Sequence, residues 1–128
     1  MRNVVRVIVG LVALFNVGLG VAFFVDPAQM GLQFFLSSLG TQGLATMRAD
    51  MTAFFITGGG FALLGAWRCR REPLLVPLSL LTIAIVGRAV SLVADGAPET
   101  AFPPMVAEAI MIAVLLLGYR NFGATDRP

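Results

Sequence analysis

Four long apolar segments dominate the sequence, and charged residues, prolines or glycines separate them. Such segments are typical of membrane-spanning helices, because about 20 apolar residues rising ~1.5 Å each cross a hydrocarbon core roughly 30 Å thick. We predict that the spans are residues 4–25, 49–67, 74–93 and 105–119. The pattern therefore predicts an all-α membrane protein, with one integral membrane domain over residues 1–128 built as a four-transmembrane-helix bundle.

The segment between the first two spans has a different pattern. Polar residues recur every four positions, and large apolar residues occupy the opposite side. The polar positions are Gln29, Gln33 and Ser37, and the apolar positions are Leu32, Phe35, Leu36 and Leu39. This predicts a short amphipathic helix over residues 28–39 that lies in the membrane interface. Asp26 suits its N-cap, Pro27 its first turn, and Gly40 and Gly43 its end. It could cover the ends of the spans, or act as a gate or partner-docking surface.

The arginines are distributed unevenly among the ends of the predicted spans. Most of the nine lie near the chain ends or between the second and third spans: Arg2, Arg6, Arg68, Arg70, Arg71, Arg120 and Arg127. The other two connections are mainly acidic. Because basic residues concentrate on the cytoplasmic side of membrane proteins, we expect both termini in the cytoplasm. Trp67 and Tyr119 would then lie at the cytoplasmic interface, where aromatic residues are enriched.

Arg88 lies inside the third apolar segment. A guanidinium at the middle of a membrane helix costs roughly 2.5 to 3.5 kcal/mol on insertion scales, so it normally has an acidic partner, water or a function. At ~1.5 Å per residue it would lie ~10 Å below the outer end of its helix. Ser91 and Asp95 follow at spacings of three and four and therefore share its helical face.

Carboxylates from other spans are expected near the same depth as Arg88. Glu108 would lie ~6 to 8 Å deep in the fourth span, and Arg48 and Asp50 would lie at the outer rim. The candidate polar cluster is Arg48, Asp50, Arg88, Ser91, Asp95 and Glu108. In one interpretation Arg88 pairs with Glu108 or Asp95 and fixes the packing of the bundle. In the other, the cluster forms an outward-facing pocket for an anionic or zwitterionic ligand such as a lipid headgroup.

Small residues mark where helices can approach one another. Gly58, Ala62 and Ala66 are spaced by four residues, and this face predicts close helix packing in the second span. Asn16 is a polar residue near the middle of the first span, and we interpret it as an interhelical or backbone hydrogen-bond donor.

Composition excludes several classes of function. The net charge is only +2 and no basic run resembles a nucleic-acid footprint, so we expect no nucleic-acid partner. The chain has no histidine and one cysteine, Cys69. Without histidine or several cysteines, the usual haem, zinc, copper and iron–sulfur ligand sets cannot form. We therefore predict no cofactor and no metal, and no catalytic motif indicates an enzyme.

Several of these features occur together in a known family. Asp26-Pro27 follows the first span, Arg48 precedes the glycine-rich second span, and Glu108 lies in the fourth. The most specific stretch is Gly-Arg-x-x-Ser-x-x-x-Asp-Gly-x-Pro, which begins at Gly87. This arrangement resembles the small bacterial four-span proteins known as domain of unknown function 4345. The resemblance implies a bacterial inner-membrane protein with four helices, and it implies no particular activity.

Two classes of function fit the sequence. In the first, which the small size and close-packing faces favour, the protein is a non-catalytic accessory or assembly subunit of a larger bacterial inner-membrane complex. In the second, it binds or transports a lipid or other small amphiphile through the charged pocket in the periplasmic half of the bundle. The expected partners are membrane lipids, together with other membrane subunits or further copies of the chain.

Overall fold

The computed structural model describes residues 1–123, and this part of the chain is helical with short connections. The elements are α1 (Arg2–Val25), α2 (Pro27–Gln33), α3 (Gly40–Arg68), η1 (Glu72–Leu74), α4 (Leu75–Ala94), η2 (Glu99–Ala101) and α5 (Phe102–Asn121). Arg127 and the end of the polar tail lie outside the described residues. Four helices in residues 1–123 are long and apolar enough to cross a membrane, as predicted.

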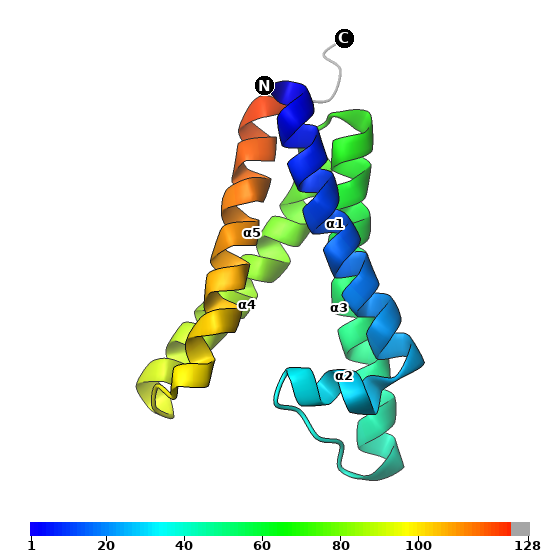
Figure 1. Cartoon of the computed structure of the whole chain (residues 1–128), viewed down its shortest axis with the longest axis vertical. Helices are drawn as coiled ribbons and strands as arrows, with labels where there is room; N and C mark the ends of the chain where they lie inside the picture. The colour runs from blue at the N-terminus through cyan, green and yellow to red at the C-terminus, as the bar shows by residue number, and fades with distance from the viewer. Residues whose placement is uncertain (124–128) are drawn as a thin grey trace.

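The helices form two antiparallel pairs that meet at one end of the molecule. α1 runs alongside α3, and α4 runs back against α5, so the N-terminus and the end of α5 lie at the same end (Figure 1). Away from that end, α4 and α5 diverge from α1 and α3, and α2 lies across the base of the α1–α3 pair (Figure 1). The bundle is therefore closed at the end that holds Arg2 and Asn121 and splayed at the other.

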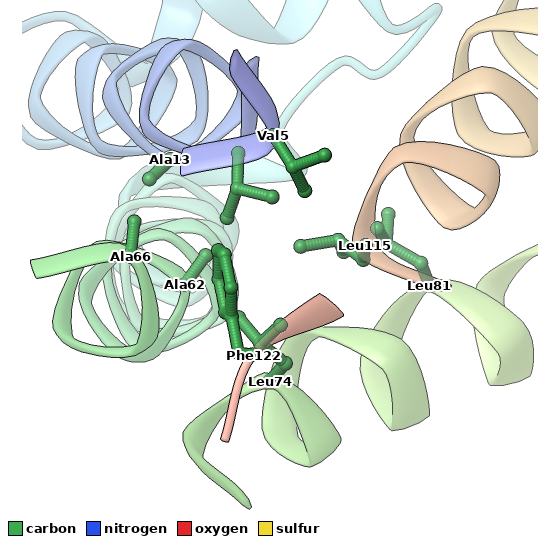
Figure 2. Packing of buried hydrophobic residues seen from close by; sticks show 9 residues of the cluster. Val5, Ala13, Ala62, Ala66, Leu74, Leu81, Leu115 and Phe122 are labelled. Carbon is green, nitrogen blue, oxygen red and sulfur yellow. The ribbon is translucent and has the colours of Figure 1, made fainter. Parts of the chain in front are cut away.

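The apolar core occupies the closed end. Figure 2 shows side chains from α1, α3, α4 and α5 meeting there, together with Leu74 of η1. The cluster consists of Val5, Val9, Ala13, Ala62, Ala66, Leu74, Leu81, Leu115 and Phe122. A side chain on Gly118 would lie 2.9 Å from both Leu74 and Val9, which shows how tightly the segments converge. Most large apolar residues elsewhere on the four long helices are exposed, as lipid-facing surfaces would be.

Glycines set the close crossing of α1 and α3. A Cβ atom on Gly59 would lie only 2.8 Å from the Ala13 carbonyl oxygen and from the backbone nitrogen of Val17. A Cβ on Gly20 would lie 2.7 Å from the side chain of Ile56. Because backbone cannot yield cheaply to such a clash, small residues are needed at this crossing. The predicted packing positions Gly58, Ala62 and Ala66 are all buried, and Gly58 faces α4 rather than α1.

Two arginines join the ends of the same helix pair. Arg6 of α1 donates hydrogen bonds to the Ala66 and Trp67 carbonyl oxygens, at 2.9 and 3.0 Å, at the end of α3. At the opposite end, Arg48 of α3 donates to the Phe24 carbonyl oxygen at the end of α1, at 3.0 Å. The last carbonyl groups of a helix lack partners within the helix, and they carry partial negative charge. Each helix therefore supplies the cation that satisfies the C-terminus of the other.

The predicted helix over residues 28–39 is only partly present. Asp26 caps α2 as expected, with its side chain accepting from the Gln29 backbone N–H at 3.3 Å, and Pro27 is the first helical residue. The helix ends at Gln33, however, and the chain reverses through a left-handed turn at Phe35, whose φ is +58°. The Leu36 N–H then donates to the Gly31 carbonyl oxygen at 2.8 Å.

The reversal depends on Gly31 and moves the start of the second span. A Cβ on Gly31 would lie 2.2 Å from the Met47 side chain and 2.9 Å from the Leu36 carbonyl oxygen, so only glycine fits beneath the turn. Gly40, predicted to help end the short helix, instead begins α3, which thus starts well before the predicted Ala49. At ~1.5 Å per residue its 29 residues exceed the hydrocarbon thickness, so its polar first turns extend past the apolar layer.

Candidate functional site

A partly open cavity of about 580 Å³ lies between the two helix pairs in the splayed half of the molecule. α1, α3, α4 and α5 contribute to its wall, together with Gln33 at the end of α2, the following Phe34 and Phe35, and Thr100 of η2. Its volume is within the range of roughly 300 to 1,000 Å³ that small-molecule sites occupy. The wall is largely apolar and rich in phenylalanine: Phe15, Phe34, Phe35, Phe54 and Phe55.

The two charged residues of this wall form an ion pair across α4 and α5. Arg88 Nε donates to Glu108 Oε1, and the two helices are adjacent and antiparallel, which brings residues far apart in sequence to one level. Glu108 is only 7% exposed, whereas the Arg88 side chain is 40% exposed. The pair thus balances the charge of a buried carboxylate and leaves part of the guanidinium accessible.

The second oxygen of Glu108 is buried without a hydrogen-bond partner. Oε2 has essentially no accessible surface, and no donor within residues 1–123 reaches it. An unsatisfied buried polar group costs roughly 1 to 3 kcal/mol, and more when it is charged. Nearly all such groups in folded proteins find a partner in protein, in water or in a ligand. This oxygen is therefore an acceptor, in the wall of a cavity, with its hydrogen-bonding capacity unused.

The remaining members of the predicted polar cluster do not join Arg88 and Glu108. Asp50, Ser91 and Asp95 are exposed, and neither aspartate forms an ion pair with another described residue. Arg48 is used at the end of α1. Residue spacing predicted that all of these residues lie in the outer half of the bundle, but depth along a helix does not determine the direction in which a side chain leaves it.

An aromatic cluster holds the segment after α2 against the cavity. The Phe34 ring lies 5.3 Å from that of Phe23 on α1 and 5.7 Å from that of Phe55 on α3, measured between ring centroids. Phe23 and Phe55 stack at 5.8 Å. These contacts position Phe34 and Phe35 at the cavity wall. The amphipathic pattern predicted an interfacial helix over this segment and did not indicate that Phe34 and Phe35 line a cavity.

Asn16 joins α1 to α5 through Met111. It is buried, and its amide nitrogen donates to the Val12 carbonyl oxygen at 2.8 Å and to the Met111 sulfur at 3.3 Å. The expectation of a backbone or interhelical hydrogen bond is confirmed on both counts. Met111 itself lines the cavity, so this contact fixes part of its apolar wall.

No protein-family model, curated protein or solved structure matched this chain when they were compared with it. The resemblance to the bacterial four-span family therefore stays a prediction.

The ion pair generates a prediction about stability. Arg88→Ala should lower the free energy of unfolding by roughly 3 kcal/mol, because it leaves the Glu108 carboxylate buried and unpaired. Adding Glu108→Gln should restore much of that loss, since the amide carries no charge. Asp95→Ala, the matched control at an exposed position, should change stability by less than about 0.5 kcal/mol. Reversible unfolding in detergent micelles is measured for the wild type, Arg88→Ala, Glu108→Gln, the double variant and Asp95→Ala, and strictly additive losses at Arg88 and Glu108 would show that the two residues are not coupled.

Proposed function

We propose that this protein is a non-catalytic membrane protein that binds a small amphiphile in the cavity between its two helix pairs. The observation that carries the proposal is the unpartnered, buried Oε2 of Glu108, a residue in the wall of a largely apolar cavity of small-molecule size. An apolar wall with a few convergent polar groups is the usual design of a ligand site. The apolar wall would hold a hydrocarbon chain or ring, and the ion pair would hold the polar group.

The cavity favours amphiphile binding over the accessory-subunit role. The exposed apolar faces of the four long helices suit lipid as well as a protein partner, so they do not distinguish the two roles. A cavity of about 580 Å³ with a polar group in its wall suits a small molecule specifically. In the described part of the chain, the wall offers Arg88, Glu108 and the Thr100 hydroxyl as candidate reactive groups, and Glu108 is paired with Arg88 rather than with a nucleophile, which supports binding without chemistry.

We further propose a bacterial inner-membrane location with both termini in the cytoplasm. The support is the arginine distribution, because Arg6, Arg68 and Arg120 all belong to the closed end of the bundle. The splayed half would then face the periplasm. Cys69 lies at the closed end and is partly exposed. A membrane-impermeant maleimide should therefore label Cys69 only after cells are lysed, and labelling in intact spheroplasts would reverse the proposed orientation.

Filling the cavity should remove the ligand. Ala107 lines the cavity, whereas Ala109 lies on the same helix, is exposed, and is not part of the wall. We expect native mass spectrometry of the protein released from lipid nanodiscs to show a bound amphiphile. Occupancy should fall at least tenfold in Ala107→Phe and be unchanged in Ala109→Phe, because only the first ring enters the cavity.

Two outcomes would contradict this proposal. Equal occupancy in the two variants would show that the amphiphile binds elsewhere on the protein surface. A stoichiometric larger membrane protein, retained without any bound amphiphile, would instead support the accessory-subunit role.

A further inference from the structure

The ion pair leaves two hydrogen-bonding capacities unused on residues that line the cavity. Oε2 of Glu108 can only accept, and it has no donor in the described part of the chain. Arg88 contacts Glu108 through Nε, and its side chain remains 40% exposed, so the terminal nitrogens can still donate. A ligand that satisfies both groups must therefore donate one hydrogen bond and accept another within a short distance.

The charge balance of the wall restricts the ligand further. Arg88 and Glu108 already neutralise each other, and no other charged residue among residues 1–123 lines the cavity. An anionic headgroup would approach the Glu108 carboxylate, and a cationic one would approach the Arg88 guanidinium. Either would add a net charge to a wall whose own charges already cancel, and an uncompensated charge is disfavoured where it is partly removed from water. A zwitterion would have to compete with the existing ion pair, because Arg88 and Glu108 already serve as counter-ions to each other.

We infer that the polar group of the ligand is an uncharged hydroxyl. A hydroxyl carries one donor and two acceptor lone pairs on a single oxygen. It can therefore donate to Glu108 Oε2 while it accepts from Arg88. This inference rests on the proposed function, and it replaces the anionic or zwitterionic ligand that the sequence suggested with an uncharged one. Phenylalanine rings in the wall, including Phe54 and Phe55, can also pack against an aromatic ring, so an alkylphenol is the most suitable probe.

A pair of probes that differ by one methyl group tests the inference. 4-Octylphenol and 4-octylanisole have the same ring and chain, but the anisole oxygen cannot donate. We expect the phenol to raise the unfolding temperature of the full chain in lipid nanodiscs, with an apparent Kd at least about tenfold lower than that of the anisole. The phenol can donate a hydrogen bond to the Glu108 carboxylate and the anisole cannot, and a hydrogen bond to a charged group is stronger than one to a neutral group.

Variants assign this preference to the cavity. Glu108→Gln should reduce the preference for phenol to about threefold or less, because the amide can itself donate to the ether oxygen. Asp50→Asn is the matched control, since it removes an exposed carboxylate outside the cavity wall, and it should retain the full preference. If Glu108→Gln alone does not fold, the double variant Arg88→Gln/Glu108→Gln provides the same comparison with an uncharged wall.

The possible outcomes separate this inference from the proposed function. Equal affinity for phenol and anisole, both lost in Ala107→Phe, would overturn the hydroxyl inference while supporting an amphiphile site. Tighter binding of 4-octylbenzoate than of the phenol would also overturn it, because an anion would then be preferred. Binding of none of the three probes would overturn both proposals.

Discussion

The structure depends on how an arginine and a glutamate are accommodated among apolar helices. Neither Arg88 nor Glu108 is stable alone in hydrocarbon, and their ion pair is what allows α4 and α5 to carry them side by side. The pairing also determines which faces of these two helices meet. Because it uses one carboxylate oxygen and leaves the other buried without a partner, the pair both joins the helices and leaves a polar position in the cavity wall.

The remainder of the fold explains why a cavity exists beside this pair. At the closed end, small residues and core side chains bring α1, α3, α4 and α5 together. α1 and α3 stay in contact along their length through the Gly20 and Gly59 crossing and the arginine contacts at both ends. α4 and α5 instead diverge from that pair (Figure 1). The space between the pairs is closed on one side by Phe34 and Phe35, which the turn after α2 directs there.

Sequence patterns predicted the four long helices better than they predicted where α2 ends or which side chains line the cavity. Long apolar runs identify membrane helices directly, and the Asp26 cap followed by Pro27 was visible because those residues act within a few positions of each other. The end of α2 was not predictable from the same pattern, because it depends on Leu36 returning over Gly31 and on Met47 from α3. A buried arginine and glutamate indicated a pair in the bundle. Asp50 and Asp95 lie outside the cavity, and phenylalanine rings form much of its wall. Both features depend on how each helix is rotated and how far the helix pairs diverge, and the spacing of residues in one sequence does not predict either.

Solid-state NMR in lipid bilayers can measure the central contact directly. With the guanidinium nitrogens of arginine labelled with ¹⁵N and the carboxyl carbons of glutamate with ¹³C, the Arg88 and Glu108 signals are assigned by their loss in Arg88→Gln and Glu108→Gln. The account predicts a dipolar contact corresponding to a separation within about 4 Å, as an ion pair requires. An absent contact, with the Arg88 guanidinium exchanging freely with water, would contradict the pair and with it the proposed binding site.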